Sequence, residues 1–377
     1  MNGSHRHQAR YDRVSTANER FEMITSDRRA DAASARPSNA TERTTNLNSS
    51  ARPSNATERT TNPNSSAMAR DARAGLVHLP RSIPPKYFYD ERGSRLFDAI
   101  CDLPEYYLAR AETSLLAEHA SEIVARAAAT TLVELGSGMA RKTRLLIDAL
   151  CARTPLPRYV PFDIAREPIE ASAHALLARY PRLSVRGVVG DFDCDLPQLS
   201  LAAPPSAGPR LFALLGSTIG NLDEQEAPEF LRAVANLLTD RDTFLLGVDQ
   251  VKDERVLHAA YNDAQGVTAA FNKNVLRVLS RGLDGDFDER GFDHLAFYDT
   301  ERQRVEMHLV SQRRMVVRLR AINLRVELTG GERVRTEISR KFTRASVARM
   351  LGQGGMHLRE WFCGADGAFA LCVAEKA

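Results

Sequence analysis

The stretch 131–138, which reads Thr-Leu-Val-Glu-Leu-Gly-Ser-Gly, constrains the fold more than any other part of the chain. A short apolar run that ends in an acid and a Gly-x-Gly turn is how a parallel strand presents its backbone to a nucleotide-like ligand. Glycine allows backbone angles that other residues avoid, and it removes side chains that would hold a ligand away. We therefore expect a strand here, followed by a helix over residues 141–150 whose N-terminal amides face the ligand.

The spacing after the turn narrows the choice of ligand. A dinucleotide fingerprint has a third glycine three residues after Gly138, where this chain has Arg141, and the difference argues against NAD and FAD. The chain also lacks a Gly-x-x-x-x-Gly-Lys-Ser/Thr run, so a phosphate-binding loop for ATP is not supported. The turn resembles the first motif of the class I S-adenosylmethionine (SAM) methyltransferases. By itself it fits an ordinary strand-to-helix turn equally well.

Further apolar segments support a ligand-binding sheet. Asp163 ends a second predicted strand, where it can bind ribose hydroxyls, cap the following helix, or do both. Asp191 and Phe192 follow a third strand and could meet an adenine amine and ring, although such residues are usually turn and core. Predicted strands at 159–163, 183–189, 211–215 and 243–248 alternate with predicted helices at 166–180 and 224–238. This alternation is typical of an α/β fold with a doubly wound parallel sheet, which binds ligands at the carboxyl ends of its strands.

The pattern changes after the fifth strand and indicates a second lobe. Residues 251–279 read as a helix, and alternating segments from Met307 onward indicate antiparallel hairpins with a turn at Gly330 and Gly331. These segments are 315–319, 324–328 and 333–338, followed by a helix at 344–353 and strands at 358–362 and 368–374. We expect a SAM-binding domain of residues 116–250 and 342–377. An inserted α+β substrate-binding lobe would comprise residues 76–115 and 251–341.

The first 75 residues differ in composition from the rest of the chain. Residues 35–50 (ARPSNATERTTNLNSS) recur as residues 51–66 with one change, Leu47 against Pro63. The segment is polar and poor in aromatic residues, so we expect a disordered tail with a tandem repeat, too short for a solenoid. Its basic residues account for the net charge of +3, but they are scattered among acids and do not indicate nucleic-acid binding.

Cysteine, histidine and hydrophobic patterns argue against other kinds of site. The five cysteines form no Cys-x-x-Cys pair and the nine histidines show no metal-ligand spacing, so we predict no metal and no cysteine or serine nucleophile. No apolar run approaches the roughly 18 residues of a membrane span, and no secretory segment follows the N-terminus. We expect a cytoplasmic, monomeric protein without a membrane partner.

Six stretches carry a closer resemblance to a known family. They are 84–90 (PPKYFYD), 103–107 (LPEYY), 134–138 (ELGSG), 216–222 (GSTIGNL), 266–272 (GVTAAFN) and 335–342 (RTEISRKF). With these stretches, the chain from about residue 79 onward resembles the histidine-specific Nα-methyltransferases of ergothioneine biosynthesis, which convert histidine into its trimethylated form, hercynine. The resemblance covers most of the chain apart from the tail.

The resemblance implies roles for individual residues. Glu337 and Ser339 would hold the imidazole: two apart on a predicted strand, they point to one face and can meet both ring nitrogens, although by themselves they fit a solvated strand face better. Asn221 would bind the α-amino group, and Tyr106 and Tyr261 the amino acid backbone groups. Supporting pocket residues would be Tyr89, Gly216, Thr268, Met307 and Ile338. The SAM ligands would be Gly136, Lys142, Asp163, Asp191 and Phe192, with Lys142 beside the methionine carboxylate.

The expected reaction is an in-line displacement in which the amine attacks the methyl group of SAM. An α-amino group with a pKa near 8 is partly neutral at neutral pH, so no strong base is required. Asn221 would orient the amine lone pair, and Tyr106 or Tyr261 would relay protons. Three transfers end at a quaternary ammonium, a cation that aromatic rings favour.

The chain departs from the family pattern at two places. Leu108 and Ala109 replace an expected Pro-Thr step, and Met139 stands where the family usually has a small or hydroxyl residue.

Two other functions remain open. One alternative is a SAM-dependent N-methyltransferase of another amino acid or small amine, because a glutamate can also hold an indole N–H or an amide. The other is a SAM-binding regulator without turnover, which the presence of Asn221 and the tyrosines disfavours.

Overall fold

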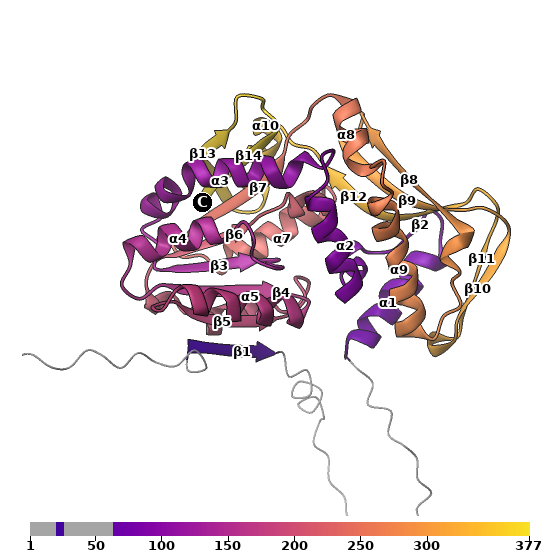
Figure 1. The fold of residues 1–377 in the computed structure, drawn as a ribbon, viewed down its shortest axis with the longest axis horizontal. Helices are drawn as coiled ribbons and strands as arrows, with labels where there is room; N and C mark the ends of the chain where they lie inside the picture. Colours follow the sequence, from indigo (N-terminus) through magenta and orange to yellow (C-terminus); the bar gives the residue numbers. More distant parts are fainter. Residues whose placement is uncertain (1–19, 26–62) are drawn as a thin grey trace, which may run out of the picture.

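The larger lobe of the protein is built on an eight-stranded sheet (Figure 1). The computed structural model describes residues 20–25 and 63–377. The sheet order is β1 (Phe21–Thr25), β5 (Ser184–Val189), β4 (Arg158–Asp163), β3 (Thr131–Leu135), β6 (Arg210–Leu214), β7 (Thr243–Asp249), β14 (Phe369–Lys376) and β13 (Met356–Cys363). In this order, the six strands from β1 to β7 pair in parallel. The strand β14 pairs antiparallel with both of its neighbours, β7 and β13. This is the predicted doubly wound sheet with an antiparallel end.

Helices cover both faces of this sheet, which is why its central strands are apolar throughout. Every residue of β3, β6 and β7 is buried. Leu132 faces one core with α3 (Tyr107–Arg126), α4 (Arg144–Arg153) and α5 (Arg166–Arg179), whereas its neighbour Val133 faces the other. That second core contains α7 (Glu226–Ala235) and α10 (Arg344–Gln353), whose bounds match the predicted helix at 344–353.

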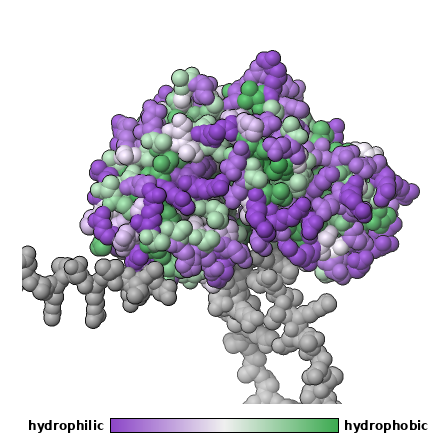
Figure 2. Space-filling view, in the orientation of Figure 1, coloured by the Kyte–Doolittle hydropathy of each residue, from purple (hydrophilic) through white to green (hydrophobic). Residues whose placement is uncertain are grey.

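The smaller lobe combines two sheets with helices and a core of its own. One sheet has the order β2 (Arg81–Ser82), β12 (Arg333–Arg340), β9 (Arg304–Ser311) and β8 (Phe292–Asp299), and the other pairs β10 (Met315–Leu319) with β11 (Leu324–Leu328). Its helices are α1 (Pro63–Val77), α2 (Glu91–Cys101), α8 (Glu254–Tyr261) and α9 (Val267–Leu283). On the face drawn in Figure 2, hydrophilic and hydrophobic residues are interspersed. No helix in the described ranges is long and apolar enough to cross a membrane.

The Gly330–Gly331 turn does not join a hairpin, contrary to prediction. It connects β11 to β12, which belong to different sheets, because β12 pairs with β9 instead. Gly331 has a φ of 82° and its N–H donates to the Ser311 carbonyl, so the turn is tied to the end of β9. The strand β8 was not predicted at all.

Two predicted helices also need correction. The helix expected at 141–150 begins at Arg144, because Ala140 adopts a left-handed φ of 52° and delays helical geometry. The helix expected at 251–279 is two helices, α8 and α9. Gly266, with a φ of 72°, precedes α9, and the Asp263 carboxylate accepts the N–H groups of Val267 and Thr268.

The N-terminal segment contributes more to the fold than predicted. In β1, Met23 pairs with Gly187 of β5, and Arg20 donates to carbonyls of Tyr180, Leu183 and Leu177 at the end of α5. In α1, Ala72 and Leu76 are each 1% exposed. The expectation of a tail up to residue 75 is therefore wrong for β1 and α1. Most of the repeated stretch 35–66 lies outside the described residues.

Candidate active site

The glycine turn after β3 meets the end of β4. Gly136 and Gly138 have φ values of 71° and 47°, and the Cβ that another residue would carry at Gly136 comes within 3.6 Å of the Phe192 ring. One oxygen of Asp163 accepts from the Gly138 N–H at 2.8 Å and the other from the Ala165 N–H at 2.9 Å. Asp163 thus ties the turn to the second strand, and three backbone N–H groups leave its carboxylate about one acceptor site for a ligand hydroxyl.

Glu134, at the end of the motif strand, is a buried carboxylate. It accepts hydrogen bonds from Thr143 and Tyr159. Burial raises the pKa of Glu134 to about 7, although these two hydrogen bonds lower it. Glu134 is only 3% exposed and its two oxygens are engaged by neighbouring side chains, so its place is structural support beneath the turn.

Asp191 and Phe192 follow β5, as predicted, and each makes contacts within the protein. Phe192 stacks on Phe162 with ring centroids 5.5 Å apart and lies edge-on to Phe230. Asp191 forms an ion pair with Lys86 at 2.9 Å. Because Lys86 comes from the smaller lobe, this ion pair connects the two lobes beside the candidate cofactor site.

Lys142 lies beside a carboxylate that sequence analysis missed. It pairs with Glu112 of α3, whose side chain is 0% exposed. Both Glu112 oxygens also accept from the Gly216 N–H, at 2.8 and 3.0 Å. A Cβ at Gly247 would lie 2.1 Å from Glu112 Oε1, so a larger residue there would displace the Glu112 carboxylate from this position. Glu112 therefore joins the segment after β3 to the segment after β6.

Asn221 and Glu337 meet across the two lobes. Asn221 ends a short 3₁₀ helix after β6, and its Nδ2 donates to Glu337 Oε1 and to the Ile338 carbonyl, both at 2.8 Å. Both partners are acceptors, so both amide hydrogens are used and Asn221 Oδ1 remains an acceptor. Burial raises the pKa of Glu337 to about 7, although the Asn221 hydrogen bond and the charge of Lys341 lower it.

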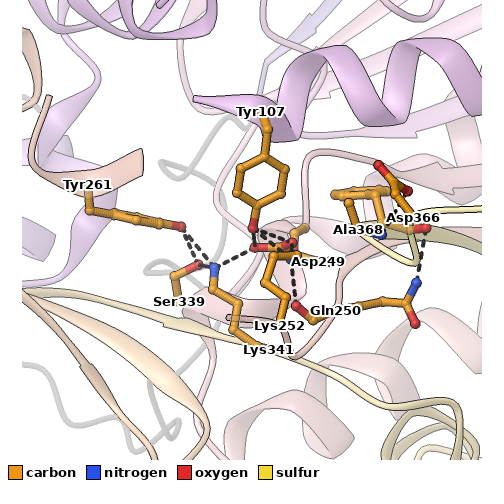
Figure 3. Close-up of polar contacts among 11 residues, drawn as sticks. Tyr107, Asp249, Gln250, Lys252, Tyr261, Ser339, Lys341, Asp366 and Ala368 are labelled. Carbon is orange, nitrogen blue, oxygen red and sulfur yellow. Dashed lines mark hydrogen bonds and ion pairs between the residues drawn. The ribbon is translucent and has the colours of Figure 1, made fainter. Parts of the chain in front are cut away.

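A second polar cluster gathers around Ser339 and Lys341, at the end of the strand β12 that also carries Glu337 (Figure 3). Tyr261 donates to Ser339 at 2.8 Å, and Lys341 donates to Ser339 at 2.8 Å and to Tyr261 at 3.0 Å. Lys341 also pairs with Asp249 at 2.8 Å. Asp249 ends β7, accepts from the Tyr107 hydroxyl at 2.8 Å and pairs with Lys252. Tyr261 and Ser339, which were predicted to bind different parts of the substrate, thus contact each other and a charged residue, Lys341, that was not predicted.

Aromatic rings surround these polar groups. Tyr106 is 9% exposed and its ring lies 6.4 Å from that of Tyr261 and 6.3 Å from Phe97. Burial raises the pKa of the Tyr106 hydroxyl well above its usual value, and the nearby Tyr261 and Glu337 add to the effect. Tyr89, 37% exposed, packs edge-on against Phe97 and Phe271.

The remaining predicted pocket residues take supporting positions. Met307 lies opposite Glu337 in the β9–β12 pairing and is 2% exposed. Thr268, in the first turn of α9, is buried, and its N–H donates to Asp263. Gly216 has a φ of 76°, and a Cβ there would lie 3.5 Å from Lys142 Nζ. Gly216 is also the residue whose N–H donates to Glu112.

The chain matches the model of a family described as histidine-specific methyltransferase, SAM-dependent, over residues 68–376. The chain belongs to this family. It is 44% identical over 309 residues to the histidine N-alpha-methyltransferase of Mycolicibacterium smegmatis, a match that covers 82% of this chain and 95% of that protein. The protein of the same description from Mycobacterium tuberculosis shows the same identity and coverage. Ergothioneine biosynthesis protein 1 of Neurospora crassa is 30% identical over 314 residues, covering 79% of this chain and 34% of that protein.

Family membership confirms the predicted family, enzyme class and use of SAM. The matched region begins inside α1 and ends within β14, so it includes both lobes. The candidate site residues all lie within that region.

Proposed function

We propose that the protein transfers methyl groups from SAM to the α-amino group of L-histidine, three times, to form hercynine on the way to ergothioneine. The family and the 44% identical relatives support the reaction. The observation that carries the assignment of the site is the contact between Asn221 and Glu337. This contact supports the proposal because it joins the side chain proposed to accept the amine to the one proposed to accept the imidazole N–H.

The residues around the glycine turn fit SAM. Gly136 has no side chain, so its own backbone can approach the ligand closely, and the Asp163 carboxylate can accept from a ribose hydroxyl. Phe192 offers an aromatic face and Asp191 a carboxylate for the adenine, while Lys142 has N–H donors beyond its bond to Glu112 for the methionine carboxylate. When bound, SAM supplies a methyl group that its sulfonium makes electrophilic.

Asn221 orients the substrate amine. Its Nδ2 hydrogens are both spent on Glu337 and the Ile338 carbonyl, so its Oδ1 accepts an amine N–H and leaves the nitrogen lone pair free to attack. Tyr106 and Tyr261 bind the other amino acid groups and accept or pass on the proton that each transfer releases. The α-amino group is partly neutral near pH 8, so selection of the neutral form replaces a strong base.

Glu337 and Ser339 hold the imidazole. They lie two residues apart on β12 and can reach the two ring nitrogens from one side, with Met307 as the cross-strand neighbour of Glu337. The buried rings of Tyr106 and Tyr261 suit the cationic product, because a desolvated aromatic face attracts a quaternary ammonium. The cytoplasmic location and the monomeric state remain predictions.

A panel of substrates tests the assignment. The purified protein is incubated with SAM and each of the twenty amino acids separately, and the products are analysed by mass spectrometry. We expect methylation of histidine and of no other amino acid. Methylation of another amino acid would support the alternative substrate, and SAM binding without any product would support the regulator.

A further inference from the structure

Lys341 is a buried cation at the end of β12, one residue beyond the strand (Figure 3). Its side chain is 0% exposed, and its Nζ lies 2.8 Å from Asp249, 2.8 Å from Ser339 and 3.0 Å from Tyr261. Burial lowers the pKa of Lys341, but the Asp249 carboxylate outweighs it and holds the pKa above its usual value. The group is therefore an ammonium.

The number of hydrogens fixes the direction of these contacts. An ammonium has three N–H donors and no acceptor, whereas a hydroxyl has one donor and two lone pairs. Each Lys341 hydrogen has one acceptor, so the hydroxyls of Tyr261 and Ser339 each give one lone pair to Lys341. The two hydroxyls are 2.8 Å apart and share one hydrogen between them.

Tyr261 is the donor in this shared bond. A phenol, with a pKa near 10, is a stronger donor than an aliphatic alcohol. Ser339 then accepts from both Tyr261 and Lys341, so both of its lone pairs are used. Its own hydrogen must point away from these groups, and Ser339 can only donate to a ligand. Tyr261 keeps one lone pair for an N–H of the substrate.

We infer that Lys341 is a positioning residue that fixes the Ser339 hydroxyl as a donor and so selects a ring with one N–H and one unprotonated nitrogen. The inference rests on the proposed function, in which Glu337 and Ser339 hold the imidazole. Ionised Glu337 accepts the N–H, and Ser339 donates to the other nitrogen. Neutral imidazole satisfies both groups, whereas an indole, a pyrrole or a phenyl ring leaves the Ser339 hydrogen without an acceptor.

Lys252 provides a matched control because it shares a carboxylate with Lys341. Both lysines pair with Asp249, but the other contacts of Lys252 are the Tyr107 hydroxyl at 2.7 Å and the Gln250 carbonyl at 2.6 Å. Lys341→Met removes the donor to both site hydroxyls while Asp249 keeps two partners. Lys252→Met removes a positive charge from the same carboxylate and leaves the Lys341 contacts in place.

The test compares L-histidine with the two pyrrolylalanines, each of which keeps one ring N–H and replaces the other ring nitrogen with C–H. In the wild type, we expect kcat/KM with SAM to favour histidine over the better pyrrolylalanine by about 30-fold or more, the effect of one lost hydrogen bond. In Lys341→Met the Ser339 hydroxyl can turn to Tyr261, so this preference falls by about tenfold or more, mainly through a higher KM for histidine. Lys252→Met keeps the preference within about threefold of the wild type.

A preference in Lys341→Met that stays within about threefold of the wild type would overturn the inference, because a general loss of structure lowers turnover of both substrates alike. If Lys341→Met does not fold, as judged by circular dichroism, the double variant Lys341→Met/Asp249→Asn is used instead, because it removes both members of the buried charge pair. A fall of about tenfold in its preference for histidine supports the inference, and a preference within about threefold of the wild type overturns it. A wild-type protein that fails to methylate histidine contradicts the proposed function itself. An active wild type whose preference is independent of Lys341 contradicts only the inference.

Discussion

Asn221→Ala should strongly reduce methylation of histidine while the protein stays folded. The change removes two hydrogen bonds of 2.8 Å, to Glu337 and to the Ile338 carbonyl, and the Oδ1 acceptor proposed for the amine. A bond to a charged group is worth about 1.5–3 kcal/mol and a neutral one about 0.5–1.5 kcal/mol. Loss of the amine contact and of the Glu337 orientation together therefore costs about 2–4 kcal/mol, or about 30- to 1,000-fold in kcat/KM.

The assay is initial-rate kinetics with histidine, with SAM binding measured separately by calorimetry. Asn236→Ala, at an exposed position after α7, is the matched control and should leave kcat/KM within about twofold of the wild type. SAM affinity should change by less than about threefold in Asn221→Ala, because the Asn221 side chain bonds to Glu337 and to the Ile338 carbonyl rather than to the glycine turn. A loss in kcat/KM below about tenfold would refute the role of Asn221.

Three further predictions concern the carboxylates Glu337, Glu112 and Glu134. Glu337→Gln should raise the KM for histidine by about tenfold, since a neutral amide accepts more weakly than a carboxylate. Because the pKa of Glu337 is about 7, wild-type kcat/KM should rise with pH through 7; an equally steep rise in the variant would contradict the assignment. Glu112→Ala leaves Lys142 and a backbone N–H without their buried partner, so calorimetry should show SAM binding weakened by about tenfold, with the exposed Glu118→Ala as control; unchanged affinity would argue against this support. The folded-state pKa of Glu134 is about 7, above the ordinary 4.5, so its ionisation opposes folding and stability is lost as pH rises from about 4.5 to 7. Glu134→Gln should remove up to about 3 kcal/mol of this loss in denaturant titrations at pH 5 and pH 8, and an identical pH dependence in both proteins would be inconsistent with it.

The parallel sheet was predictable because its strands are buried on both faces and read as short apolar runs bounded by glycine and acids. The β8 strand was missed because exposed and half-buried residues such as Asp293 and His294 interrupt its apolar pattern. The strand that pairs with β12 could not be predicted from the residues near β12 in the sequence. The pairing of β12 with β9 rather than β11 depends on contacts between distant parts of the chain.

Candidate site residues could be predicted where they lie in a stretch that resembles the family. Residues outside such stretches, or without a known role in them, were missed. Asn221, Glu337 and Ser339 came from the family resemblance, and the structure brings Asn221 to Glu337 from different lobes. Glu112 looks like any helical glutamate until the fold places it under Gly216. Lys341 did carry a signal, because it continues the alternation of Glu337 and Ser339 at the end of the strand.

The most direct test of the central claim uses SAM with a ¹³C-labelled methyl group and L-histidine as the only acceptor. Mass spectrometry and carbon NMR then follow the product over time. The account predicts the successive appearance of one, two and three labelled methyl groups, all on the α-nitrogen. Label on an imidazole nitrogen, or no labelled histidine at all, would contradict it.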